Sequence, residues 1–343
     1  EAYLLHGYLN TPKLLELALH DGIDPVTGKR IGPATGKAGD FAGYEDLYAA
    51  FEEQLAHAVD IKITVSNWLD RMYAASAPAP FLSALVADCI GRGRDYYDGG
   101  ARYNTDYLQC CGIGTMTDSL SAIRTHVYGR RDLSWDELLG AMSADWAGKE
   151  ALRQRLANLT PRFGNDDDGA DGIAQRVFGS LFRAIDGRPS PRGGTWRVDF
   201  LSTTCHVYFG KRTGATPDGR HAGLPISDGA SPCQGADRHG PTAVMNSLGK
   251  LGHSRTGGTL LNMRFLPAAL AEEESLGKLA ALVRGYFRKG GHHVQFNVVD
   301  EATLRAAQKK PEDYRDLLVR VAGYSDYFVD LDRNHQEEII SRT

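Results

Sequence analysis

Cysteine thiols are the most reactive side chains in this sequence, and two of the five cysteines are adjacent. Cys110 and Cys111 form this pair, and the others are Cys89, Cys205 and Cys233. The odd count, without a Cys-x-x-Cys spacing or a Cys/His cluster, predicts neither a disulfide framework nor a zinc site and is typical of a reducing compartment. We therefore expect all five to be small buried apolar residues.

An acidic run and a histidine pair are two further groups that could bind a metal ion. The run, DDDGAD at residues 166–171, lacks the ligand spacing and the closing glutamate of an EF-hand. We interpret it as acidic residues at a helix start, where the helix dipole favours negative charge, with calcium as the alternative. His292 and His293 lie in an expected strand, so their rings would face opposite sides. The sequence therefore predicts no bound metal.

Gly323 lies in the segment RVAGYSDYF, residues 320–328. Taken alone, it is a loop glycine after a helix, where a positive φ angle is common. Glycine also has a chemical property of its own. Its α-carbon can become planar without a clash from Cβ, so that a radical there is delocalised into both flanking amides.

Helical periodicity dominates the first half of the chain. Apolar residues at spacings of three and four predict a long helix over residues 44–76, and a Gly/Pro/Asp-rich loop precedes it over residues 20–43. A capping box, SWDE, starts another helix at Ser134. Further helices are expected from Pro12 and over residues 81–92 and 118–127.

The pattern changes after residue 190, where strand-like and helical segments alternate. Strands are expected over residues 196–209, 258–265 and 293–299. Helices are expected over residues 270–289 and 301–309, with a short one from Pro311 to about Val321. This alternation predicts an α/β architecture.

Composition excludes several classes of function. The 343 residues carry a net charge of −4, which disfavours a nucleic-acid partner. No apolar run approaches the roughly 20 residues that span a bilayer, and the first residues do not form a signal peptide. We expect a cytoplasmic protein with no membrane partner.

The chain begins at Glu1 and ends at Thr343, and both ends lie within segments that look ordered. We interpret both ends as cuts in a longer polypeptide.

The segment around Gly323 resembles the signature of the glycyl radical enzymes, the family of pyruvate formate-lyase and its dehydratase and decarboxylase relatives. The similarity continues in order along the chain, at residues 27–36, 99–104, 118–120, 216–220, 231–235 and 290–297. It implies the C-terminal half of a ten-stranded α/β barrel with the radical loop inserted in the barrel. Residues 1–215 would belong to the barrel and residues 216–343 to the glycine radical domain.

The resemblance also implies the chemistry. Gly323 would store a protein-derived radical and oxidise a cysteine to a thiyl, which takes hydrogen from a small-molecule substrate. In the family that cysteine lies shortly before a segment like residues 1–10, so it is expected outside this sequence. We reject Cys110 and Cys111 as substitutes, because the resemblance places them where helices pack in the barrel wall. S-adenosylmethionine and an iron–sulfur cluster would belong only to a separate radical S-adenosylmethionine activating enzyme.

The opening EAYLLHGYLN and the segment NTDYLQCC, residues 104–111, are most similar to the branch that removes water from trans-4-hydroxy-L-proline to give a pyrroline carboxylate. By this resemblance Tyr8 and Thr203 would contact the substrate, although Tyr8 could equally be a core tyrosine. The alternatives are a diol or glycerol dehydratase, a carbon–sulfur or carbon–nitrogen lyase, a formate C-acetyltransferase, or a non-catalytic radical-bearing fragment. A homodimer is expected for the full-length protein.

Overall fold

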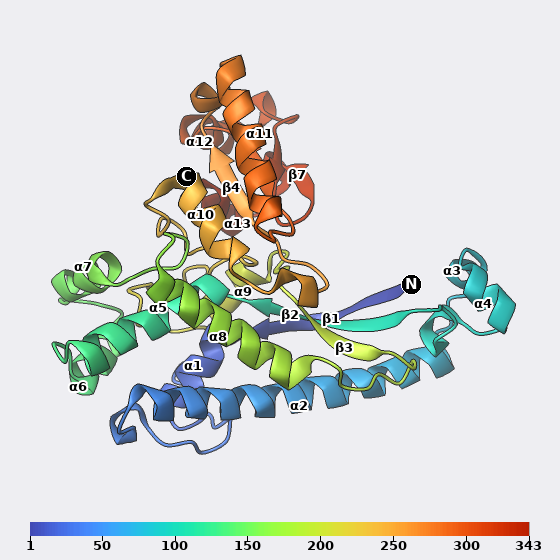
Figure 1. The fold of residues 1–343 in the computed structure, drawn as a ribbon, viewed down its shortest axis with the longest axis horizontal. Helices are drawn as coiled ribbons and strands as arrows, with labels where there is room; N and C mark the ends of the chain where they lie inside the picture. The colour runs from blue at the N-terminus through green and yellow to red at the C-terminus, as the bar shows by residue number, and fades with distance from the viewer. Residues whose placement is uncertain (343) are drawn as a thin grey trace.

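A three-stranded parallel sheet forms the centre of the fold in the computed structural model, which describes residues 1–342 (Figure 1). Its strands follow the order β1 (Ala2–Asn10), β2 (Asn104–Cys111) and β3 (Thr195–Asp199). The pairing of β1 with β2 shifts register between Leu5 and Tyr8. Parallel strands joined through helices confirm the expected α/β fold.

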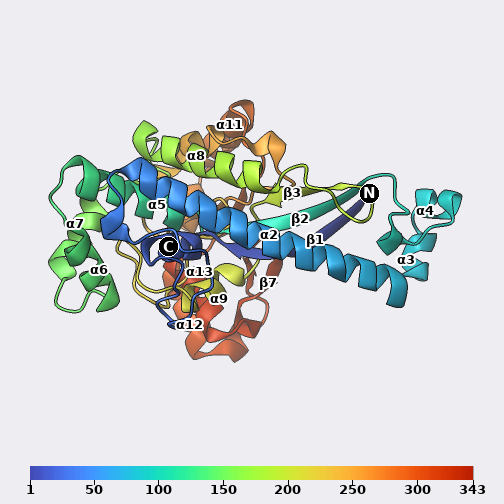
Figure 2. The same cartoon turned by 90° about the horizontal axis from the view of Figure 1, so that it is seen from below.

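Helices pack along this sheet (Figures 1 and 2). The first helix, α1 (Thr11–Leu19), begins near Pro12, as the sequence predicts, and is capped by the Asn10 side chain. The long helix α2 (Tyr44–Ser76) agrees with its predicted range and packs against α8 (Asp168–Ile185), which also contacts β3. Buried side chains from these helices form the main core with the sheet, among them Leu47, Phe51, Leu55 and Phe178.

Three predictions in the helical region need correction. The helix expected over residues 81–92 is two short helices, α3 (Pro80–Ala84) and α4 (Ala87–Arg92). The helix expected over residues 118–127 begins earlier, as α5 (Ile113–Ala122), and continues as a π-helix over Ile123–Gly129. Residues 104–111, where helix packing was expected, form the central strand. From Asp106 onward every residue of β2 is buried, so the strand lacks the alternation that would have identified it.

The remaining helices of this half are α6 (Trp135–Ser143), capped by Ser134, and α7 (Glu150–Leu159).

The last third of the chain stands to one side of the three-stranded sheet (Figure 1). Two pairs of strands occur here: β4 (Asn262–Phe265) is parallel to β5 (Gln295–Val298), and β6 (Leu318–Arg320) forms an antiparallel hairpin with β7 (Ser325–Tyr327). The helices are α9 (Cys205–Lys211), α10 (Gly240–Gly249), α11 (Glu273–Arg288), α12 (Glu301–Lys309) and α13 (Arg333–Ser341). A second core joins α12, α13 and the hairpin through Leu304, Val319, Phe328, Ile339 and Ile340.

Two expectations in this part are wrong. The strand predicted over residues 196–209 ends at Asp199, and Cys205 begins α9. The backbone turns between them, where Thr203 has a φ angle of +47°, a left-handed conformation that interrupts an extended strand. The helix predicted from Pro311 is a single 3₁₀ turn, Pro311–Asp313, and β6 follows it. No helix among residues 1–342 combines the length and the apolar character needed to cross a membrane.

Candidate active site

Gly323 lies in the tight turn of the β6–β7 hairpin. Arg320 pairs with Ser325, and the Val321 N–H donates a hydrogen bond of 2.9 Å to the Tyr324 carbonyl. The φ angle of Gly323 is +87°, in the region that favours glycine. The positive φ agrees with the sequence interpretation, but the glycine follows a strand and not a helix.

The surroundings of Gly323 are open on one side and closely packed on the other. Gly323 is exposed in the described chain. On its packed side, a Cβ atom at this position would lie 3.2 Å from Cδ1 of Leu201. The Gly323 N–H donates to Oε1 of Gln295 at 3.2 Å. A side chain larger than hydrogen would therefore meet both backbone strain and a close neighbour.

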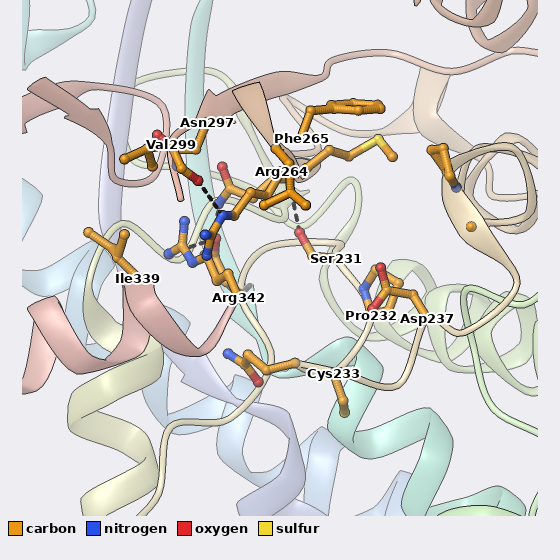
Figure 3. Close-up of a pocket in the computed structure, with 18 of the residues that line it drawn as sticks. Ser231, Pro232, Cys233, Asp237, Arg264, Phe265, Asn297, Val299, Ile339 and Arg342 are labelled. Atoms are coloured by element: carbon orange, nitrogen blue, oxygen red, sulfur yellow. Dashed lines mark hydrogen bonds and ion pairs between the residues drawn. The ribbon is translucent and has the colours of Figure 1, made fainter. Parts of the chain in front are cut away.

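Two further side chains form hydrogen bonds with the backbone of the turn. Asn297 donates to the Arg320 carbonyl and accepts from the Arg320 N–H, both at 2.8 Å, and Arg342 donates to the Val321 carbonyl at 2.8 Å. Asn297 and Arg342 also line a cavity of about 250 Å³ together with Arg264 and Ser231 (Figure 3). Asn297 belongs to a segment that the sequence analysis singled out, whereas Arg342 lies in no motif.

Arg342 also belongs to a buried charged cluster with Asp228, Glu338 and His206, which the sequence analysis did not predict. Asp228 accepts hydrogen bonds from Ser202 and Asn262. Glu338 accepts from Arg342 at 2.8 Å, and its carboxylate lies 3.2 Å from Nε2 of His206. Burial alone would raise the pKa of Glu338, but the Arg342 guanidinium and His206 hold that pKa well below its usual range. The last helix is thus fixed to the turns that follow β3.

Tyr8 and Thr203, the two expected substrate-binding residues, lie together. Tyr8 Oη is 2.9 Å from Thr203 Oγ1, and both side chains are partly buried. Burial, together with nearby Cys205 and Cys111, raises the pKa of Tyr8 despite its bond to Thr203. Thr203 lies two residues after Leu201, whose side chain packs against Gly323. Thr203 was expected on a strand, but it lies on the turn between β3 and α9.

The cysteines differ in exposure. Cys89, Cys110, Cys111 and Cys233 are buried and unbridged, as expected, whereas Cys205 is only half-buried. Cys205 begins α9 beside Thr203, so the expectation that it is a core residue is wrong. Burial raises the pKa of Cys111 well above its usual range, which keeps that thiol protonated and unreactive.

The acidic run begins a helix, as the sequence predicts. Asp167 caps α8, and the ammonium of Lys250 lies within 2.9 Å of carboxylate oxygens of Asp166, Asp168 and Asp171. A lysine therefore occupies the place that the calcium alternative would need. His292 and His293 precede β5, which begins at Gln295, so the expectation that they lie on a strand is wrong.

Two other groups of possible metal ligands each contain a guanidinium. His6, Asp70 and Asp106 surround Arg192, which lies 3.6 Å from Asp70 and also pairs with Asp106. In the second group, Asp118, Asp218 and Cys233, Arg162 lies 3.5 Å from Asp118 and donates to the Asp218 carbonyl. The arginine supplies the positive charge in both places, so neither group fits a metal ion.

Two regions of the chain match known protein families. Residues 1–210 match the family described as pyruvate formate lyase-like, and residues 226–329 match the one described as glycine radical. The chain belongs to the pyruvate formate lyase-like family. This membership confirms the resemblance drawn from the segment around Gly323.

Curated relatives of this family are similar along the whole chain. Trans-4-hydroxy-L-proline dehydratase of Clostridioides difficile is 50% identical over 343 residues, which cover 100% of this chain and 44% of the relative. (2S)-3-sulfopropanediol dehydratase of Klebsiella oxytoca is 40% identical, with 98% and 42% covered. The chain thus spans less than half the length of these pyruvate formate lyase-like relatives.

Solved structures of the family superimpose closely on this chain. The crystal structure of hydroxyproline dehydratase from Clostridioides difficile, with trans-4-hydroxy-L-proline bound, gives a TM-score of 0.97 at 50% identity and covers 99% of this chain and 43% of its own. The glycerol-bound glycerol dehydratase of Clostridium butyricum gives 0.95 at 39% identity, covering 100% and 44%. These matches confirm that the fold is that of a part of a glycyl radical enzyme.

Proposed function

We propose that this chain is the radical-bearing part of a glycyl radical dehydratase that converts trans-4-hydroxy-L-proline to a pyrroline carboxylate. The observation that carries the proposal is the hydroxyl pair of Tyr8 and Thr203, two residues from Leu201, whose side chain packs against Gly323. The same pair was assigned to substrate binding from the sequence, and the relative at 50% identity is a hydroxyproline dehydratase.

The residues of this chain have distinct parts in this reaction. Gly323 stores the radical between turnovers, since its α-carbon carries no side chain and both flanking amides can share the unpaired electron. The hydroxyls of Tyr8 and Thr203 bind a polar group of the substrate, and each can donate or accept a hydrogen bond.

The hydrogen that moves during turnover is carried by a cysteine outside this sequence. That thiyl takes a hydrogen atom from the carbon next to the hydroxylated carbon, the hydroxyl leaves as water with a proton from a general acid, and the thiol returns its hydrogen. Four of the five cysteines of this chain are buried, and we assign the hydrogen transfer to none of them.

Formation of the radical on Gly323 requires a second protein. A radical S-adenosylmethionine enzyme with an iron–sulfur cluster takes a hydrogen atom from the Gly323 α-carbon, and no metal ion binds to this chain. We also propose residues 1–215 as barrel and residues 216–343 as the glycine radical domain, with a homodimer as the assembled state.

The test uses the protein as its gene encodes it, activated without oxygen by its activating enzyme. We expect an electron paramagnetic resonance signal centred on glycine, and formation of a pyrroline carboxylate from trans-4-hydroxy-L-proline. Glycerol and (2S)-3-sulfopropanediol are assayed in parallel. Turnover of either compound in place of hydroxyproline would overturn the assignment of the substrate. A glycine signal without turnover of any of the three compounds would favour a non-catalytic, radical-bearing fragment.

A further inference from the structure

We infer that Gln295 is a positioning residue for the radical glycine, which sets the electron density at Gly323 through the backbone N–H. This inference rests on the proposed function, since it assumes that Gly323 carries the radical. It follows from a directed chain of hydrogen bonds that starts at Gly323 and ends on a buried carboxylate.

The chain of hydrogen bonds runs in one direction. The Gly323 N–H donates to Oε1 of Gln295 at 3.2 Å, and Nε2 of Gln295 donates to Oδ1 of Asn262. Nδ2 of Asn262 then donates to Oδ2 of Asp228. Gln295 and Asn262 are register partners in the β4–β5 pair, so the strand pairing itself aligns the two amides. Every donor points away from the glycine and toward the anion.

The end of the chain is fixed and buried. Asp228 is 3% exposed and Gln295 is 5% exposed. Ser202 donates to the other oxygen of Asp228, and Arg342 lies 3.5 Å from the carboxylate. In such surroundings hydrogen bonds in series polarise one another, and a carboxylate at the end strengthens each of them. Gln295 Oε1 is therefore a stronger acceptor for the Gly323 N–H than an isolated amide would be.

This acceptor acts on the donor side of the radical. An α-carbon radical is stabilised by electron donation from the amide nitrogen and withdrawal by the carbonyl. A hydrogen bond from N–H to a polarised oxygen increases the donation from nitrogen, and it also fixes the plane of the amide relative to the α-carbon. Loss of this bond should make the radical less stable and reduce the spin shared with nitrogen.

Asn297 provides a matched control on the same strand. It lies two residues after Gln295, so both side chains point to the same face of β5. Asn297 holds the same hairpin through two hydrogen bonds of 2.8 Å to Arg320, yet none of its bonds reaches Gly323. A role of Gln295 in mere loop anchoring would make the two residues equivalent, whereas electronic tuning would not.

The first measurement uses the unactivated protein labelled with [¹⁵N]glycine. We expect Gln295→Met to move the Gly323 amide proton resonance upfield and to speed its exchange with solvent by about 3- to 10-fold, the effect of one hydrogen bond. Gln295→Glu keeps an acceptor oxygen and should retain most of the shift. An unchanged Gly323 resonance in Gln295→Met would overturn the inference, because the hydrogen bond would then be absent.

The second measurement compares the activated proteins. We expect the ¹⁵N hyperfine coupling of the glycine signal to fall in Gln295→Met, with about 2- to 10-fold fewer spins per chain, and to recover in Gln295→Glu. Asn297→Leu should leave the coupling per radical unchanged. Equal ¹⁵N couplings in the wild type and Gln295→Met would overturn the role of Gln295. So would a fall of the coupling in Asn297→Leu as large as that in Gln295→Met. Either result would leave the proposed function standing. A wild-type protein without any glycine signal would overturn the proposed function and this role with it.

Discussion

The hydroxyl of Tyr8, on the first strand of the central sheet, lies 2.9 Å from the hydroxyl of Thr203, on the turn between β3 and α9. The parallel pairing of β1, β2 and β3 brings together these residues, which are 195 positions apart in the sequence. The register shift between Leu5 and Tyr8 lies directly before the tyrosine. Bulges of this kind re-aim side chains at the ends of sheets, where sites form.

Tyr8→Phe should impair turnover more than it impairs folding. The change removes one hydroxyl from the pair and leaves the ring in place. We expect kcat/KM for trans-4-hydroxy-L-proline to fall about 10-fold, the value of one hydrogen bond to a polar group. Tyr103→Phe, which changes a side chain that is 65% exposed, is the control and should stay within twofold of wild type. Equal activity of both variants would remove Tyr8 from the substrate site.

The β6–β7 hairpin should open more readily than the central sheet. β6 and β7 have three residues each, and side chains from Gln295, Asn297 and Arg342 supply much of the anchoring of their turn. Segments with few buried backbone bonds exchange through local opening. Hydrogen exchange followed by mass spectrometry should show faster exchange over residues 318–327 than over β2.

Arg342→Met tests this anchoring directly. It removes the bond to the Val321 carbonyl and leaves Glu338 buried without its guanidinium partner, so exchange over the hairpin should rise further. Arg102→Met, which changes an exposed arginine, should have no such effect. Slow exchange of the hairpin in Arg342→Met would contradict the anchoring role.

The buried carboxyl of Asp118 should make the free energy of unfolding fall as pH rises. Burial raises the pKa of this carboxyl to about 7, because the opposing effect of Arg162 is smaller and the negative charge of Asp218 adds to the rise. In the unfolded chain the same carboxyl titrates near pH 4, so between about pH 4 and 7 the folded state keeps a proton that the unfolded state has lost. Its contribution to stability therefore declines over that window and is constant above it.

The comparison of Asp118→Asn with wild type isolates this contribution. Urea unfolding at pH 5 and pH 8 should show a larger loss of stability in the wild type than in Asp118→Asn, because asparagine does not titrate. The exposed Asp98→Asn is the control. Identical pH dependence in wild type and Asp118→Asn would show that Asp118 is ionised in the folded protein at pH 5.

Cys205 should be the thiol of this chain that reagents reach first. It is the half-buried cysteine, and the other four are buried. Because burial raises its pKa, alkylation should be slow at pH 7 and should speed up as pH rises. Peptide mass spectrometry after brief iodoacetamide treatment should find the label on Cys205, and Cys205→Ser should remove it. Faster labelling of Cys110 or Cys111 would contradict the described burial.

The proposed site residues were chosen from local signals in the sequence. Gly323 was proposed from its immediate neighbours, and Tyr8 and Thr203 from short segments that resemble relatives. The long helix α2 was predicted to the residue, since its apolar spacing and the prolines that follow it, Pro78 and Pro80, are local signals. These features need no knowledge of distant contacts.

The support beneath the loop could not be predicted in the same way. Asp228, His206, Glu338 and Arg342 lie in no motif, and their pairing exists only after α13 packs against α9. The strand β2 was missed because burial on both faces removes alternation. The strand expected over residues 196–209 failed because the left-handed backbone at Thr203 has no sequence signal in a residue of this type.

Electron paramagnetic resonance of the anaerobically activated protein shows whether Gly323 carries the radical. We expect a doublet from the remaining α-hydrogen of glycine in the wild type, and no such signal in Gly323→Ala. We also expect that air cleaves the activated wild-type chain at residue 323 and leaves the variant intact. A doublet of equal intensity in Gly323→Ala would rule out Gly323, because the radical would then lie on another residue.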